Sequence, residues 1–401
     1  MLINRWTVIG GGFVLNLMTG IAFSWSIFVR PLMDSFGWTK TTVTLPFTIF
    51  IAVLALIMIP AGAAQDKIGP RKVAMLGGAL LGLGFILASF IEGIKNPLWL
   101  YLTFGLITGM GAGLGYACTI PPARKWFPDR PALGVGLVIM GAGMSAILFS
   151  PLQRYLIDTQ GLGMTFLIVG IVLLVVSVAS ASLLRNPPEG WKPNRWQLAQ
   201  SANSTVAARD YRPTKIIKTG RFWMLWLMFV FMGAAGLMVI GHIAAYAEEA
   251  GLAAMYAAIT ASVLSGFNAF GRPGSAMLCD KIGVAKTMLI LFTLQGAMMV
   301  IFPHFALTIV TIFIAVAIIG FNFGANFTLF PSATADSFGI KNLGGNYGLV
   351  FTAYGVGGIL GPIMGAYFYD ATQSYTMAFT IAAIFIFIAA AIALVFKRYS
   401  K

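Results

Sequence analysis

Long apolar stretches separated by short polar segments run through the whole chain of 401 residues. Most of them approach the ~20 residues that a helix needs to cross the hydrocarbon core of a bilayer. The ninth stretch is shorter than the others. The pattern predicts an all-α polytopic membrane protein with twelve transmembrane helices, at 7–29, 42–64, 73–91, 98–120, 132–156, 163–184, 222–246, 255–278, 288–302, 307–330, 347–367 and 377–395.

Composition agrees with this pattern, because 59% of the residues are hydrophobic and only 9% are charged. A mean hydropathy of +0.87 is incompatible with a globule surrounded by water. We therefore expect a chain whose surface lies mostly in lipid.

The net charge of +14 follows the predicted topology and does not indicate a nucleic-acid partner. If both termini are cytoplasmic, 21 of the 26 lysines and arginines lie in inside segments and three lie in outside loops. The positive-inside rule favours this orientation. We expect a monomer in the inner, cytoplasmic membrane, with the first span retained as a helix because no cleavage site follows it.

One long polar stretch, residues 186–220, divides the chain. It predicts a cytoplasmic linker between an N-terminal six-helix bundle (1–185) and a C-terminal six-helix bundle (221–401). The halves resemble each other, since residues 66–69 (DKIG) recur as residues 280–283 (DKIG). Such symmetry predicts two related bundles with a binding site near the middle of the membrane.

Arg272 is the most informative residue, because it lies inside the apolar run 261–279 with no acidic residue in that run. An arginine at the centre of a spanning helix costs ~2.5 kcal/mol or more, so such residues usually serve transport. We expect Arg272 to hold an anion and Asn268, one turn earlier, to orient its guanidinium. The alternative is a structural arginine neutralised by carbonyl groups or a hidden partner.

Residues 62–72 (GAAQDKIGPRK) resemble the loop between the second and third spans of major facilitator superfamily transporters. The resemblance implies a major facilitator fold with transport by alternating access. It also implies that Asp66, Lys67 and Arg71 are gating residues that latch one conformational state. Asp280 in the second, weaker copy is expected to do the same, although a solvated turn is the alternative there.

A narrower resemblance rests on residues 23–26 (FSWS), 124–130 (RKWFPDR), 270–273 (FGRP), 329–332 (LFPS) and 346–348 (NYG). This set is similar to the oxalate:formate antiporter branch and to monocarboxylate transporters. In the antiporter, an arginine and a lysine hold the two carboxylates of oxalate. Arg272 matches the arginine, but Tyr354 occupies the position of the lysine. One cation implies a small monocarboxylate, with Tyr354 as a hydroxyl ligand or as a packing residue.

The resemblance also implies an aromatic cage around the substrate. Aromatic residues in membrane helices usually only pack, but shared helix faces at 323/327 and 351/354 favour a common role. With His242 added, the expected substrate-binding residues are Arg272, Asn268, Tyr116, Phe23, Phe323, Phe327, Phe351, Tyr354 and His242.

Proton coupling has three candidates: His242, Glu248 and Glu249. An imidazole titrates near neutral pH, and burial can raise the pKa of a glutamate toward that range. The alternatives are a hydrogen-bonded core histidine and a solvated pair of glutamates at a helix end.

Together these observations predict a secondary transporter of a lactate- or pyruvate-like monocarboxylate, coupled to protons. Carboxylate:carboxylate exchange is the first alternative, and a non-transporting sensor of organic acids is the second. We expect no enzymatic activity, no cofactor and no metal, because the sequence contains no nucleophile constellation, nucleotide motif or ligand cluster.

Overall fold

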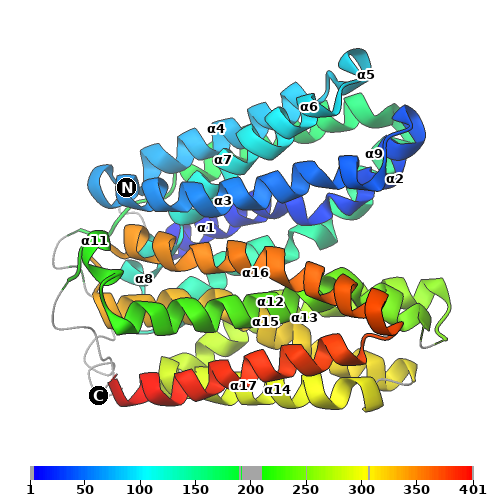
Figure 1. Ribbon diagram of the computed structural model, residues 1–401. Coiled ribbons are helices and arrows are strands. Elements are labelled where there is room, and N and C mark those ends of the chain that lie inside the picture. Colours follow the sequence, from blue (N-terminus) through cyan, green and yellow to red (C-terminus); the bar gives the residue numbers. More distant parts are fainter. Residues whose placement is uncertain (1–3, 189–190, 192–209, 250, 306–307, 400–401) are drawn as a thin grey trace. The chain divides into compact units, whose positions relative to one another are not determined.

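The computed structural model describes residues 4–188, 191, 210–249, 251–305 and 308–399, and Figure 1 shows that they form bundles of long helices. This described part contains helices and no strand, so the predicted all-α fold is confirmed. The chain divides into two compact units, residues 1–127 with 137–191 and residues 128–136 with 192–401. Most of the predicted linker, 189–190 and 192–209, lies outside the described residues.

The first unit contains the helices of the first six predicted spans. They are α1 (Arg5–Thr19), η1 (Gly20–Ser24), α2 (Ser26–Phe36), α3 (Lys40–Ile68), α4 (Pro70–Ala88), α5 (Ile91–Ile94), α6 (Pro97–Leu100), η2 (Tyr101–Thr108), α7 (Gly109–Ala117), α8 (Ile120–Trp126) and α9 (Pro131–Ala181), whose first residues group with the second unit. The element α9 contains the fifth predicted span and most of the sixth, and it is kinked between them at Gly161, where the backbone is not helical and φ is +83°.

The second unit contains the last six predicted spans and a short helix that precedes them. Its helices are α11 (Pro213–Ile216), α12 (Gly220–Glu249), α13 (Ala254–Ile282), α14 (Val284–Phe305), α15 (Ile309–Phe338), α16 (Leu343–Thr372) and α17 (Thr376–Tyr399). The ninth span is longer than predicted, since α14 has 22 residues.

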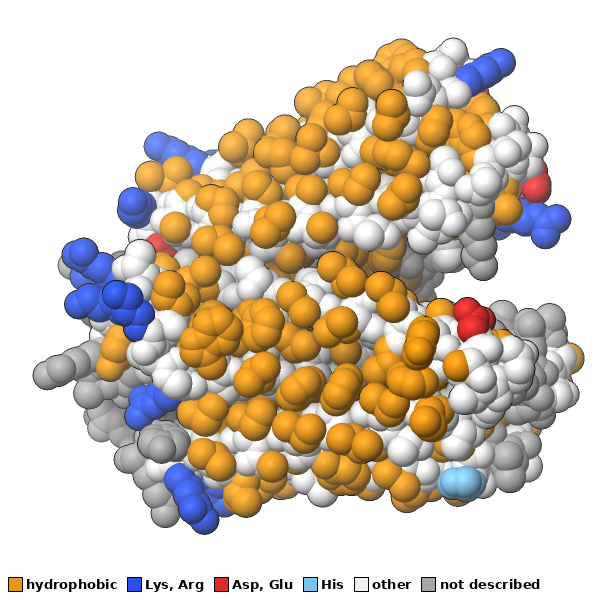
Figure 2. Space-filling model, in the orientation of Figure 1, with side chains coloured by type: hydrophobic (Ala, Val, Ile, Leu, Met, Phe, Trp, Pro, Cys, Tyr) orange, Lys and Arg blue, Asp and Glu red, His pale blue; other side chains and the backbone are white. Residues whose placement is uncertain are grey.

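Among the described residues, ten helices are long and apolar enough to cross a membrane, and α9 accounts for two of the predicted spans. Figure 2 shows hydrophobic side chains over the flanks of the helices and charged side chains near the helix ends. Large side chains such as Leu56 (63% exposed) and Ile363 (62% exposed) lie on this outer surface. Such exposure suits lipid and makes this a multi-pass membrane protein.

The repeated DKIG segments end their helices in the same way. Gly69 follows α3 with φ +86° and ψ +160°, and Gly283 follows α13 with φ +86° and ψ +155°. Glycine reaches positive φ without the steric cost of a Cβ atom, so each segment stops one helix and starts the next. The internal repeat is therefore structural as well as sequential.

Two spans of the first unit depart from regular α-helix. The first span changes to the 3₁₀ turn η1 at Gly20, and the fourth contains the π-helical segment η2. The two departures are joined by Trp25, which directly follows η1 and stacks on Phe104 of η2 with ring centroids 3.9 Å apart. Non-α segments inside helices often mark functional positions.

In the second unit, α13 and α15 pack almost backbone to backbone. A Cβ atom added to Gly324 would lie within 3.0 Å of the Cα of Asn268, and one added to Gly271 would lie 2.9 Å from the Cα of Phe321. Small residues allow this close approach between membrane helices. It fixes the helix that carries Arg272 against the helix that carries Phe323 and Phe327.

Candidate functional site

Arg272 is buried, with 2% of its surface exposed, in the middle of α13. Its guanidinium carbon lies 4.7 Å from the centre of the Phe327 ring, and Nη2 donates to Oδ1 of Asn268 at 3.4 Å. The ring face of an aromatic residue attracts a cation, most strongly where water is excluded. The structure therefore brings three of the predicted site residues, from two helices, into contact.

The backbone beside Arg272 is held as well. The hydroxyl of Thr328 on α15 donates to the Arg272 carbonyl at 3.0 Å, and the hydroxyl of Ser275 donates to the same oxygen at 3.2 Å. These bonds lie next to Pro273, which lacks an N–H and removes one bond of the α13 ladder. Sequence reasoning did not find Thr328, because only the packing of α15 on α13 brings it there.

The aromatic residues predicted on α15 and α16 form one cluster. Phe327 packs edge-to-face against Phe323 and Tyr354, at centroid distances of 5.6 and 5.2 Å. Tyr354 also contacts Phe351 at 5.2 Å. All four residues are at most 4% exposed. The Phe327 ring that carries the guanidinium therefore belongs to a single cluster of buried rings.

Phe229 on α12 is a further member that the sequence analysis missed. Its ring lies 5.9 Å from that of Phe351 and 6.0 Å from that of Tyr354, and it stacks on Phe330 at 4.1 Å. Span seven is rich in aromatic residues, so no sequence signal separated Phe229 from its lipid-facing neighbours.

Phe23 and Tyr116 belong to the first unit and are described within it. Phe23 lies in η1 and is 41% exposed, whereas Tyr116 on α7 is 6% exposed. Near Tyr116, the Asn16 amide donates to the Thr119 hydroxyl at 2.9 Å, and that hydroxyl donates to the Tyr116 carbonyl at 2.9 Å. Asn16 is a buried polar residue of the first span that the sequence analysis did not single out.

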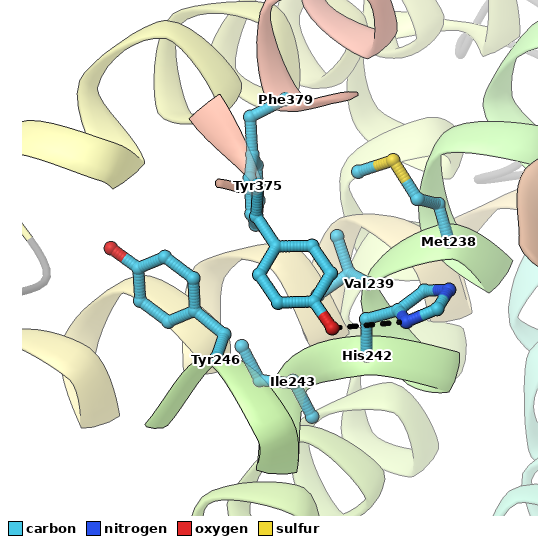
Figure 3. A pocket seen from close by; sticks show the side chains of 7 residues that line it. All are labelled: Met238, Val239, His242, Ile243, Tyr246, Tyr375 and Phe379. Atoms are coloured by element: carbon cyan, nitrogen blue, oxygen red, sulfur yellow. Dashed lines mark hydrogen bonds between the residues drawn. The ribbon is translucent and has the colours of Figure 1, made fainter. Parts of the chain in front are cut away.

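His242 lies in a separate place, in a narrow pocket between α12, the segment that joins α16 to α17, and α17 (Figure 3). Its Nε2 is 3.1 Å from the Pro362 carbonyl, and its Nδ1 is 3.4 Å from the Tyr375 hydroxyl. The pocket is lined by Met238, Val239, His242, Ile243, Tyr246, Tyr375 and Phe379, and it has no room for a water molecule. None of the residues that line this pocket belongs to the cluster described around Arg272.

The remaining coupling candidates, Glu248 and Glu249, belong to the last turn of α12. Their side chains lie outside the described part of the structure.

Asp280, one of the predicted gating residues, accepts hydrogen bonds from the amides of Ala132 and Leu133, both at 2.9 Å. These are amides of the first turn of α9, where a carboxylate satisfies unpaired donors and the helix dipole. Asp66 near the end of α3 accepts a hydrogen bond from the Gln65 amide. Lys67 lies in the last turn of α3, and Arg71 lies in the first turn of α4.

Two related bundles of spanning helices, with a buried cation in one of them, define the class of a polytopic solute transporter. Residues 12–354 and 277–401 match the model of the Major Facilitator Superfamily. The chain belongs to this superfamily, which confirms the resemblance on residues 62–72.

Curated relatives support the narrower resemblance. The chain is 30% identical to the oxalate:formate antiporter of Oxalobacter formigenes, over 97% of this chain and 91% of that protein. It is 32% identical to the uncharacterized MFS-type transporter YhjX of Escherichia coli, over 89% and 86% of the two chains. It is 28% identical to monocarboxylate transporter 13 of Rattus norvegicus, over 95% and 86%.

Solved structures share the fold. A Major Facilitator Superfamily transporter, FucP, in the outward conformation aligns with a TM-score of 0.71 at 19% identity, over 98% of both chains. The human organic anion transporter MFSD10 aligns with a TM-score of 0.73 at 14% identity, over 97% of this chain and 99% of that chain.

Proposed function

We propose that this transporter carries a small monocarboxylate of the lactate or pyruvate type together with a proton, by alternating access. Four features of the molecule support this function: the buried cation, its aromatic surroundings, the residue at the second charge position and the histidine on α12.

The observation that carries the proposal is the Arg272 guanidinium, buried on the face of Phe327. A guanidinium presents two parallel N–H groups that match a carboxylate, and the pair is stronger where water is excluded. The apolar rings of the cluster exclude water around the charge. The arrangement suits a carboxylate with a small organic group attached.

The charge of the ligand follows from the neighbouring helices. The spans 222–246, 255–278, 307–330 and 347–367 contain Arg272 as their single lysine or arginine. Tyr354, at the position that the antiporter resemblance gives to a lysine, packs on Phe327 at 5.2 Å. Its hydroxyl is uncharged, so a monoanion is neutralised by this cluster while a dianion would keep one uncompensated charge.

The names of the relatives favour the same class of substrate. One is an oxalate:formate antiporter and another is a monocarboxylate transporter, so both names refer to small carboxylates. The comparison with the antiporter covers nearly the whole chain, including the helices that form the cluster.

His242 is the proton carrier that the described geometry supports best. The Pro362 carbonyl can only accept, so neutral His242 donates from Nε2 and its Nδ1 accepts from the Tyr375 hydroxyl. An imidazolium donates from both ring nitrogens, so a proton carried at Nδ1 would require the Tyr375 hydroxyl to accept there. Ionisable neighbours from the packed helices are Tyr246 and Tyr369, the latter stacked on Tyr375 at 4.5 Å.

Exchange of one carboxylate for another is the alternative function, and Asn268 favours it. The Asn268 amide that accepts from Arg272 does not titrate, so this contact provides no proton with the substrate.

Uptake into proteoliposomes tests the proposal. Labelled formate, acetate, lactate, pyruvate and oxalate are offered with an inward proton gradient, a potassium-valinomycin potential or an internal counter-substrate. A monoanion moving with one proton carries no net charge, so the proton gradient should accelerate uptake and the potential should have little effect. Preference for oxalate would contradict the monocarboxylate, and strict dependence on internal substrate would establish exchange.

A further inference from the structure

Gly236 on α12 lies against one of the rings of the Arg272 cluster. A Cβ atom built on this glycine would lie 2.6 Å from Cε2 and 2.8 Å from Cγ of Phe323, and closer still to Cδ2. The Phe323 ring therefore occupies the space where any other residue at 236 would place its side chain.

The ring is connected to the cation through one further residue. Phe323 meets Phe327 edge-to-face at 5.6 Å, with an interplanar angle of 89°. Phe327 in turn lies 4.7 Å below the Arg272 guanidinium. The position of Phe323 therefore limits the position of the Phe327 ring. Through that ring it also limits the space beside the guanidinium.

Helix α15 has no room to retreat when this ring is pushed. On the face that packs against α13, Cβ atoms added to Gly320 and Gly324 would lie 3.2 and 3.0 Å from the Cα atoms of Leu264 and Asn268. Backbone contact of this kind leaves no gap to close. A side chain at 236 would consequently move the Phe323 ring and not the helix that carries it.

We propose that Gly236 is a specificity-determining residue, because the space that it leaves for Phe323 sets the size of the acid that fits beside Arg272. This inference rests on the proposed monocarboxylate function and adds the residue that selects among the acids. Phe323 packs on Phe327, the ring that carries the Arg272 guanidinium, and Gly236 acts on this ring through Phe323.

An alanine at 236 should narrow the site. Ordinary contact begins near 3.4 Å, so the Phe323 ring must move by roughly an ångström away from residue 236, and Phe327 is a ring that it already contacts. One methylene group of substrate is worth about 10- to 200-fold in such pockets. We expect Gly236→Ala to raise the Kd of lactate and pyruvate about tenfold or more relative to that of formate.

The experiment measures Kd for formate, acetate, lactate and pyruvate with the purified full-length protein in detergent. Gly233→Ala is the matched control, since a Cβ atom there would meet nothing closer than 3.8 Å. It should leave the ratio of lactate to formate affinity within twofold of wild type. Gly236→Ala combined with Phe323→Leu should restore the ratio, because leucine replaces the ring by a smaller side chain.

If Gly236→Ala fails to fold, Phe323→Leu alone decides the matter, because it should shift preference toward larger acids. An unchanged ratio in a folded Gly236→Ala or in Phe323→Leu overturns the inference while leaving the monocarboxylate function in place. A wild-type protein that binds none of the four acids overturns the proposed function and this inference together.

Discussion

Replacing Arg272 by lysine keeps the charge but removes the fork of donors. In the structure, the guanidinium carbon lies 4.7 Å from the centre of the Phe327 ring, and Nη2 donates to Oδ1 of Asn268 at 3.4 Å. A lysine ammonium is a compact charge on a flexible stem, so it cannot stack in this way and bind both oxygens of a carboxylate in parallel.

The loss can be estimated from these contacts. A charge-assisted hydrogen bond is worth about 1.5–3 kcal/mol, and a desolvated cation–π contact is worth about 0.5–2 kcal/mol. Arg272 is 2% exposed, so solvent screening does not reduce these values much. Together they give a loss of about 2–5 kcal/mol, which corresponds to an increase in Kd of roughly 30- to 4,000-fold.

Isothermal titration of the purified variant with the preferred acid measures this change. Arg154→Lys is the matched control, because Arg154 forms an ion pair with Asp158 at 2.9 Å while its side chain is 58% exposed. Exposed pairs of this kind contribute about 0–1 kcal/mol, so this variant should bind as wild type does. Wild-type affinity of Arg272→Lys for every tested acid would refute the reasoning and make Arg272 a structural residue.

Three further predictions concern other parts of the second unit. Tyr354→Lys supplies a second cation beside Phe327 and should let oxalate compete with a labelled monocarboxylate, by about tenfold or more. His242→Gln should abolish accumulation driven by a proton gradient and retain counterflow exchange. Gly365→Ala should have the same effect although the imidazole is present, because its Cβ atom would lie 2.6 Å from the His242 Nε2 and displace the ring. Asp280→Asn removes the charge and keeps one acceptor oxygen, so one of the two amides at the start of α9 loses its acceptor. The substitution should cost about 1–2 kcal/mol in thermal unfolding.

Each of these variants has a control in the same chain. Gly241→Ala should keep the response to the proton gradient, because its Cβ atom would lie 4.0 Å from the Pro362 Cβ, which is ordinary contact. If His242→Gln also keeps this response, another group carries the proton. Tyr354→Phe removes the hydroxyl and keeps the ring, so it distinguishes the effect of the one from that of the other. If Tyr354→Lys folds and oxalate still does not compete with the labelled monocarboxylate, residue 354 lies away from the ligand. Asp158→Asn at an exposed site should not lower the unfolding temperature, in contrast to Asp280→Asn.

The order of the helices could be predicted because bilayer thickness fixes the length of an apolar run. Details inside the helices could not. At the 3₁₀ turn that begins with Gly20, η1 approaches α9 so closely that a Cβ atom would lie 2.6 Å from the Ala142 carbonyl oxygen. That contact joins residues far apart in sequence, and hydropathy does not register it.

The candidate site, like the fold, could be predicted from the sequence only in part. Arg272 was found because a charge in an apolar run is conspicuous, and Asn268 followed from helical spacing. Thr328 and Gly236 were not found, since their roles depend on which faces of α12, α13 and α15 meet. His242 was conspicuous for the same reason as Arg272, yet its described partners are Pro362 and Tyr375 and not the residues around the cation.

The cluster lies where two closely packed helix pairs meet. On one side, α13 and α15 touch at Gly271 and Gly324; on the other, a Cβ atom on Gly357 of α16 would lie 2.9 Å from the Ala234 amide of α12. Arg272, Phe323 and Phe327 belong to the first pair, and Tyr354 belongs to the second. Contacts within a pair are backbone to backbone, whereas the described contacts between Phe327 and Tyr354 are ring to ring. Substitutions at Tyr354 or Gly236 should therefore change which acid is held, while the spacing of Arg272 and Phe327 is set by the close packing of α13 on α15 and persists.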